Sequence, residues 1–429
     1  MTELKTVRGM RDFLPAEAQA LRRVETETRR VAELYGYKEI ITPVVESYEL
    51  LSAKAGDEVR SRMFAFKDLG DRDVALRYEF TASVARLVAT TFRNEPRPFR
   101  LFSVGSVYRY DEPQRGRYRE FWQSNFELMG SNRPEADAEI LMLTDSLMEK
   151  TGLRDYAFKV GHVGVLRGIL SQEKVEDKTQ NTIMQLMDKK QYDDALRTVQ
   201  NAGVPEPCLQ VLRRLVELKG NEIFETVEKM KTCARGYEKA TAAAENLCQV
   251  LKLARQGGCD VDMSVEAGFE RGLEYYTGMI FEIYVPDMGI AVGGGGRYDR
   301  LIELFGGAST PAVGVAHGLD RILLALKEQK TEPKKEEAKR IVVIPIGDEM
   351  RGEALKVSQL LRGAELSVEV EVMGRKMAKA LEDADRRGFD CAVIVGEKEL
   401  KEQSVVLRNL KSREQKTLKV EELEEAIRG

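Results

Sequence analysis

The densest group of residues that could do chemistry is an arginine-rich window from Arg93 to Arg119. It holds seven arginines and three acidic residues, which leaves a local charge of +4 in a chain whose net charge is −4. The guanidinium group is a planar fork of donors that matches the geometry of phosphate oxygens. The polar loop 111–116 within this window therefore suits a nucleotide. A solvated, salt-bridged hairpin explains the same composition equally well.

The next segment, 118–129, is predicted to be a strand with one polar face. Side chains alternate between the two faces of a strand, so Gln123, Asn125 and Glu127 point the same way. Three polar side chains in a line on an otherwise buried strand need hydrogen-bond partners. A small polar ligand would supply them, and structural hydrogen bonds are the alternative.

A carboxylate and a hydroxyl lie at the start of a helix predicted over 82–92. These are Glu79 and Thr81, in the sequence RYEFT. Threonine is a good N-cap residue, so taken alone Thr81 is explained by helix capping rather than by ligand binding.

Three glycine-containing stretches carry further candidates. Arg271–Gly278 (RGLEYYTG) places an arginine beside two phenols, which suits an anionic group next to a flat polar ring; a hairpin end with an aromatic pair is the alternative. Gly293–Asp299 (GGGGRYD) would let the backbone approach a ligand closely, but it lacks the Lys-Ser/Thr of a P-loop. Gly314–Arg321 (GVAHGLDR) places Arg321 at a predicted helix start, where a lone arginine is more often a surface residue.

The composition excludes several classes of protein. With only His162 and His317 available, a histidine-rich metal site or a Ser–His–Asp hydrolase is disfavoured. The five cysteines contain no C-x-x-C pair, which fits a reducing cytoplasm. No apolar run approaches the roughly 18–20 residues that cross a bilayer, and the N-terminus has no signal-peptide pattern, so a cytoplasmic protein without membrane contact is expected.

The pattern of elements that must position these residues predicts an α+β fold in five parts. Residues 1–162 mix antiparallel strands with helices. They include an apolar strand from Ile40 to Val45 that contains Pro43 and is therefore expected at an edge or an interface. A helical insertion is predicted over 163–258, strands resume over 259–327, and a helix is predicted over 317–326. A charged linker, 328–340, precedes a small α/β domain, 341–429, with a mostly parallel sheet.

Taken together, these motifs resemble those of the histidyl-tRNA synthetase family, a class II aminoacyl-tRNA synthetase family, over essentially the whole chain. Arg8–Pro15 looks like the family's opening, and Pro43 falls in what looks like motif 1. Tyr108–Gln123 is similar to motif 2 and Gly314–Arg321 to motif 3. The specific evidence is Arg271–Gly278 together with Gly294–Asp299, which resemble the two histidine signatures of the family.

The resemblance implies a class II antiparallel-sheet catalytic core with a helical insertion and an anticodon-binding C-terminal domain, and it implies roles for ten residues. Arg109 and Arg271 would be catalytic, with ATP bound by Arg109, Glu79, Arg117 and Arg321. Histidine would be bound by Glu79, Thr81, Gln123, Glu127, Tyr275 and Tyr276.

The resemblance also implies the substrates ATP, L-histidine and tRNA(His). Mg²⁺ would be the cofactor, through ligands that the sequence does not identify, and the protein would be a homodimer. The imidazole ring offers one donor and one acceptor when neutral, which suits a carboxylate and a phenol.

A second reading is a binding protein, the catalytically inert regulatory subunit of ATP phosphoribosyltransferase, which shares this fold. That paralogue usually lacks the first histidine signature and the C-terminal domain, and both patterns are intact here. The chain departs from the family pattern at Phe80 and His317, where many relatives have a small and an apolar residue respectively. These departures affect only the expected shape of the ATP pocket.

Overall fold

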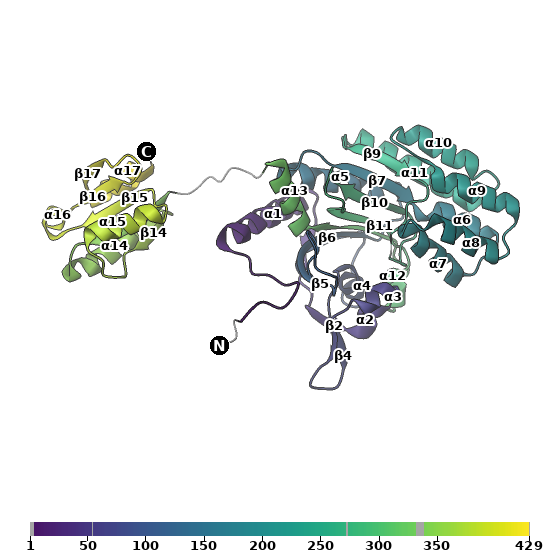
Figure 1. Cartoon of the computed structure of the whole chain (residues 1–429), viewed down its shortest axis with the longest axis horizontal. Coiled ribbons are helices and arrows are strands. Elements are labelled where there is room, and N and C mark those ends of the chain that lie inside the picture. Colours follow the sequence, from purple (N-terminus) through teal and green to yellow (C-terminus); the bar gives the residue numbers. More distant parts are fainter. Residues whose placement is uncertain (1–3, 54, 272, 332–338, 429) are drawn as a thin grey trace. The chain divides into compact units, whose positions relative to one another are not determined.

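The computed structural model describes residues 4–53, 55–271, 273–331 and 339–428, and the chain divides into two compact units, Met1–Pro333 and Lys334–Gly429 (Figure 1). Gly272 of the predicted histidine signature, residues 332–338 of the predicted linker and the chain ends at 1–3 and 429 lie outside the described residues.

The first unit is built on a nine-stranded sheet whose central strands are antiparallel, so the predicted α+β class is confirmed. Strands β1 and β9 pair in parallel with β5 and β7 respectively. In spatial order the strands are β1 (Lys38–Glu39), β5 (Phe99–Tyr108), β6 (Glu120–Met129), β12 (Ala312–Gly318), β11 (Gly293–Arg297), β10 (Met279–Tyr284), β7 (Ala157–His162), β9 (Asp262–Glu266) and β8 (Lys219–Gly220).

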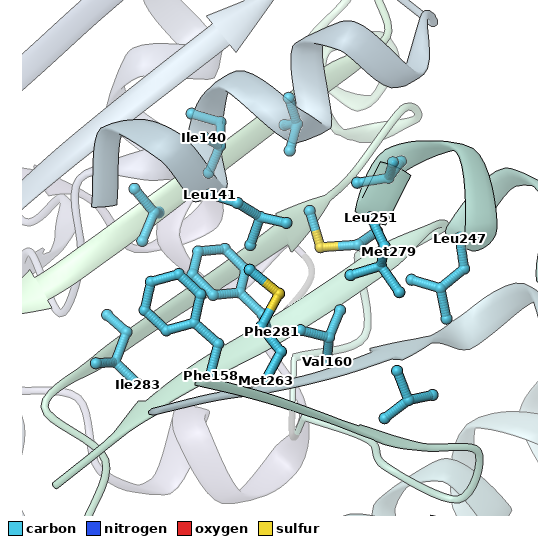
Figure 2. Close-up of a cluster of buried hydrophobic side chains, with 14 of the residues drawn as sticks. Ile140, Leu141, Phe158, Val160, Leu247, Leu251, Met263, Met279, Phe281 and Ile283 are labelled. Atoms are coloured by element: carbon cyan, nitrogen blue, oxygen red, sulfur yellow. The ribbon is translucent and has the colours of Figure 1, made fainter. Parts of the chain in front are cut away.

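Alternating side chains of this sheet supply two apolar cores, one on each face. Phe281 belongs to the larger core, which helices α1 (Pro15–Leu34), α5 (Pro134–Thr151) and α11 (Glu238–Gln256) cover. Its neighbour Ile280 belongs to the smaller core, beneath α4 (Thr81–Ala89) and α12 (Leu301–Leu304). Figure 2 shows part of the larger core, where side chains of two helices meet those of three strands: Ile140, Leu141, Leu247, Leu251, Phe158, Val160, Met263, Met279, Phe281 and Ile283.

The segment predicted as a helical insertion is helical, with only the two-residue strand β8 interrupting it. Its buried side chains belong to the same larger core as those of the sheet, so the insertion packs onto the sheet continuously. The insertion's boundaries as a separate domain stay a prediction. Before α11 its helices are α6 (Val163–Gln172), α7 (Asp177–Asp188), α8 (Tyr192–Asn201), α9 (Glu206–Glu217) and α10 (Ile223–Cys233).

The prediction of one strand through Pro43 is wrong. Two short strands flank this proline and belong to different sheets: β1 pairs with β5, whereas β2 (Val45–Ser47) pairs with β4 (Asp73–Leu76). Proline has no N–H to continue a ladder. The backbone between the two strands is held instead by Arg77, whose guanidinium donates to the carbonyl oxygen of Thr42 at 2.9 Å. Strand β4 also pairs antiparallel with β3 (Ala65–Lys67), which makes a hairpin.

The prediction of a helix over 317–326 is wrong at its start. His317 is the sixth residue of β12 and pairs with β6 on one side and β11 on the other, so its backbone is committed to the sheet. The helix that follows, α13 (Leu319–Gln329), begins two residues later. His317 is fully buried between the hydroxyls of Ser124 (3.1 Å) and Thr144 (3.3 Å), and burial lowers its pKa to about 3.

The second unit is a small α/β fold with its own apolar core. Strands β13 (Arg340–Pro345), β14 (Ser367–Val370) and β15 (Cys391–Val395) are parallel, as predicted. The sheet continues with an antiparallel pair that the sequence analysis did not resolve, β16 (Ser404–Asn409) and β17 (Gln415–Lys419). Its longer helices are α14 (Arg351–Gly363) and α15 (Met377–Arg386).

A buried ion pair fixes α5 against the sheet. The Nε of Arg297, at the end of β11, lies 3.0 Å from Oδ1 of Asp137 on α5, and the two side chains are only 7% and 0% exposed. The same guanidinium donates to the carbonyl oxygen of Ser131 at 3.0 Å. Burial raises the pKa of Asp137, and Arg297 opposes that rise. The arginine of the second histidine signature therefore acts here as a structural residue.

Replacing Asp137 should destabilise the first unit strongly. Asp137→Ala leaves the Arg297 guanidinium buried without its main partner, which should lower the free energy of unfolding by about 3 kcal/mol. Urea denaturation followed by circular dichroism measures this. Glu135→Ala, which removes an exposed carboxylate from the same helix, should change little because solvent screens its pairing with Arg133. Equal losses in the two variants would contradict the account.

Candidate functional site

A cavity opens on the face of the nine-stranded sheet that carries the smaller core. Residues of β6, β10, β11, β12 and the start of α13 line it, together with the loops around 109–118 and 271–276. All ten of the predicted site residues lie in this lining: Glu79, Thr81, Arg109, Arg117, Gln123, Glu127, Arg271, Tyr275, Tyr276 and Arg321.

The polar face of β6 forms the floor of the cavity. Gln123, Asn125 and Glu127 all line it and are all buried, while Phe126 between them packs into the larger core. The predicted alternation is therefore confirmed.

Glu127 lies at the centre of a buried hydrogen-bond network. Its Oε1 accepts from the hydroxyl of Thr81 at 2.7 Å, and its Oε2 accepts from the hydroxyl of Tyr298. Asn125 donates in turn to the Thr81 hydroxyl at 3.3 Å. Burial raises the pKa of Glu127 to about 7, against these hydrogen bonds, which lower it. Tyr298 is a site residue that sequence reasoning missed, although it lies in the singled-out motif GGGGRYD.

The capping role of Thr81 is wrong. Phe80 is the N-cap residue of α4, Thr81 is the first helical residue, and no side chain caps this helix. The local pattern does predict the helix start, but the hydroxyl makes its bond 46 residues away along the chain, to Glu127.

Glycines of β11 and β12 make room for the charged side chains of the site. A Cβ on Gly314, which pairs with Glu127 across the sheet, would overlap the Glu127 carboxylate. A Cβ on Gly294 would overlap the guanidinium of Arg271. Gly294 and Gly314 thus let ionic side chains of the protein approach the backbone.

Arg271 is anchored at the cavity wall by groups of β10. Its Nη1 donates to the carbonyl oxygen of Phe281 at 2.9 Å, and its Nε lies 3.7 Å from a carboxylate oxygen of Glu282. The ring centroid of Tyr276 lies 5.7 Å from the guanidinium carbon. An arginine held by one carbonyl and one distant carboxylate keeps donors available for a ligand.

Glu79 and Gln123 present free acceptors within the cavity. The hydroxyl of Tyr275 donates to Oε2 of Glu79 at 3.1 Å, but Glu79 Oε1 and Gln123 Oε1 have no hydrogen-bond partner among the described residues. Burial raises the pKa of Glu79, although the nearby Arg109 opposes the rise. Two unpaired buried acceptors in a cavity indicate a ligand with several donors.

Three arginines gather at the other end of the cavity. Arg321 donates to the carbonyl oxygens of Gly116 (3.0 Å) and Ala291 (2.7 Å) rather than to a carboxylate. Burial, with the like charges of Arg109 and Arg117 nearby, lowers the pKa of Arg321 to about 10. Like charges held together in a half-buried place indicate an anionic ligand with more than one charge.

The loop that carries Arg271 and the two tyrosines is also tied to the helical insertion. Gln185 on α7 donates to Oε1 of Glu274 at 2.9 Å, and Asn181 donates to Oε2 at 3.5 Å. No sequence pattern indicated that Gln185 or Asn181 contacts this loop, because their partner Glu274 lies about 90 positions away in the chain.

The described residues hold no histidine in the cavity and no metal cluster. His162 caps α6 by accepting from the N–H of Gly164 at 3.0 Å, and His317 is buried elsewhere in the sheet. Within the same residues, no three His, Cys, Asp or Glu side chains are arranged to hold a metal ion. A search of the described helices likewise finds none with the length and apolar character of a membrane span.

Comparison with known proteins finds matching families over both units. The family model "Histidyl-tRNA synthetase" matches residues 9–322, and the model "Anticodon binding domain" matches residues 340–429. The chain is 40% identical over 420 residues to the histidine–tRNA ligase of Methanococcus maripaludis strain C7, covering 97% of this chain and 98% of that one. It is 37% identical over 431 residues to that of Saccharolobus solfataricus, covering 100% and 99%.

A solved structure shares the fold over the full length. The histidyl-tRNA synthetase of Nostoc sp. PCC 7120 superposes with a TM-score of 0.78 at 24% identity, covering 100% of this chain and 99% of that one. The predicted resemblance is thus confirmed, and the chain belongs to the histidyl-tRNA synthetase family.

Proposed function

We propose that this protein activates L-histidine with ATP to form histidyl-adenylate and transfers the histidine to the 3′ end of tRNA(His). The observation that carries this function is one cavity that holds a buried carboxylate among phenols at one end and three arginines at the other. The first end suits an imidazole and the second a triphosphate.

In the first step, a carboxylate oxygen of histidine attacks the α-phosphorus of ATP, and the bond from that phosphorus to the bridging oxygen breaks, so pyrophosphate leaves. Such a transfer needs positioning and charge neutralisation more than a nucleophilic side chain. Arg271 neutralises the charge of the α-phosphate. Three further arginines hold the phosphates: Arg109, Arg117 and Arg321. Glu79 also contributes to binding of the nucleotide. In the second step, a terminal hydroxyl of the tRNA attacks the histidyl carbonyl carbon, and AMP leaves.

The free acceptors in the cavity support a binding place for the α-ammonium group of histidine. Glu79 Oε1 and Gln123 Oε1 receive the α-ammonium group, whose three donors would pair them. Glu127 and Tyr276 bond the two imidazole nitrogens. Thr81 and Tyr298 position the Glu127 carboxylate through their hydrogen bonds to it. Tyr275 positions Glu79 in the same way. An analogue without the ring nitrogens would leave buried polar groups unpaired and be rejected.

Mg²⁺ fits this cavity only together with ATP. The described residues provide no three-ligand cluster, and Mg²⁺ characteristically uses one or two carboxylates plus phosphates and water. Glu282, which lines the cavity beside Arg271, is the carboxylate that would serve. When bound, the ion would offset phosphate charge. Arg271 and Arg321 would orient the same phosphates from the protein side.

The remaining partners follow from the family. The C-terminal unit, matched by the anticodon-binding model, would contact the tRNA anticodon. A homodimer is supported by the exposed apolar side chains around Pro43, because Ile41 is 90% exposed and Val45 is 44% exposed beside the edge strand β1. The regulatory-subunit alternative is not favoured, since the relatives that match the whole chain are histidine–tRNA ligases.

Histidine-dependent exchange of pyrophosphate into ATP tests the activation step. Purified protein should catalyse exchange with L-histidine and Mg²⁺, and not with other amino acids, because only imidazole satisfies the Glu127 end of the cavity. Charging of tRNA(His) should follow under the same conditions. Absence of histidine-dependent exchange by folded protein that binds ATP would refute the proposal.

Replacing Arg271 tests its assigned role. Arg271→Ala should lower the exchange rate by about 10²-fold or more, the usual loss when a donor aimed at developing charge is removed. The thermal unfolding midpoint should stay close to that of the unaltered protein. The matched control is Arg255→Ala, since Arg255 also donates to a backbone carbonyl (Cys259, 2.8 Å) but lies outside the cavity lining. Near-normal exchange by Arg271→Ala would refute the role.

A further inference from the structure

The N-terminal segment Arg8–Phe13 lies against the arginine-rich loop of the cavity. The N–H of Arg119 donates to the carbonyl oxygen of Gly9 at 2.8 Å, and its guanidinium donates to the carbonyl oxygen of Arg8 at 3.3 Å. Gly9 has a φ of +85°, and a Cβ there would lie 2.7 Å from a side-chain carbon of Arg119. The fit of this segment to the loop therefore depends on a glycine at this position.

Arg11 of this segment contacts two residues of the cavity lining without lining the cavity itself. Its guanidinium forms an ion pair with Asp320, whose side chain is 2% exposed. It also stacks on the ring of Tyr118, with 3.8 Å between the guanidinium carbon and the ring centroid, and on the ring of Phe13 at 4.4 Å. Both Asp320 and Tyr118 line the cavity.

Asp320 precedes Arg321 in the chain, so its negative charge affects the arginine end of the cavity. The Asp320 carboxylate accepts from the backbone N–H of Trp122 at 2.5 Å, so it is fixed to β6 at the edge of the arginine end. A buried carboxylate without a cation there would repel a triphosphate or draw Arg321 into an ion pair. Arg321 instead donates to two backbone carbonyl oxygens.

We propose that Arg11 is a positioning residue for ATP: it neutralises Asp320, which leaves the charge of Arg321 to the phosphates, and it holds the Tyr118 ring against the cavity. This inference rests on the proposed function, since it assigns the arginine end to ATP. Arg11 itself touches no reacting atom and acts through Asp320 and Tyr118.

Exchange kinetics of Arg11→Ala test this role, once the unaltered protein has shown histidine-dependent exchange. The KM for ATP should rise about tenfold, as expected when one partner of a partly exposed charge pair is removed, while the KM for histidine stays nearly constant. The matched control is Arg22→Ala, because Arg22 also pairs with a buried carboxylate (Glu25, 2.5 Å) and stacks on an aromatic ring (Trp122, 5.1 Å), none of which lines the cavity. It should leave both KM values unchanged.

Two further variants separate neutralisation from simple packing. Arg11→Lys keeps the positive charge but not the planar stacking group, so it should lose less ATP affinity than Arg11→Ala. The double variant Arg11→Ala/Asp320→Asn removes the unpaired charge and should recover ATP affinity relative to Arg11→Ala alone. An unchanged KM for ATP in Arg11→Ala, an equal rise in both KM values, or no recovery in the double variant would overturn the proposal.

Discussion

The site depends on the burial of a carboxylate in the middle of a sheet. Glu127 lies on the interior strand β6, 1% exposed, and must be satisfied by hydrogen bonds, because an ionised group in a desolvated place is costly. The protein supplies two hydroxyl donors, from α4 and from the residue after β11, and a glycine on β12 to make space. Four separate segments of the chain are thereby fixed around one carboxylate, and the remaining unmet acceptors of the cavity define where a ligand must donate.

The positively charged side chains of the cavity are likewise fixed by hydrogen bonds within the protein. Arg109 and Arg321 at the arginine end, like Arg271 at the cavity wall, donate to backbone carbonyl oxygens, which orient a guanidinium without cancelling its charge. The structural Arg297 is held instead by the carboxylate of Asp137. Among the cavity arginines, carbonyl partners thus leave the positive charge of the guanidinium available to an anion.

The sequence predicted those features that follow from local periodicity. The period of two on β6 identified Gln123, Asn125 and Glu127, and the pattern over residues 163–258 predicted the insertion helices. Prediction failed where tertiary pairing overrides a local preference: Thr81 looked like a cap, His317 like a helical residue, and Pro43 like part of one strand. It could not find Tyr298 as the partner of Glu127, or Arg11 as the partner of Asp320, because these contacts join positions 171 and 309 residues apart. The family resemblance identified the ten candidate residues but not which of them bond to one another.

The claim that Glu127 selects histidine is tested most directly by calorimetric binding of L-histidine and of ATP to Glu127→Gln protein at pH 8. At that pH the unaltered carboxylate, with a pKa of about 7, is mostly ionised. Loss of a hydrogen bond to a charged group should weaken histidine binding by at least about tenfold, with ATP binding nearly unchanged. Histidine binding equal to that of the unaltered protein would contradict the account.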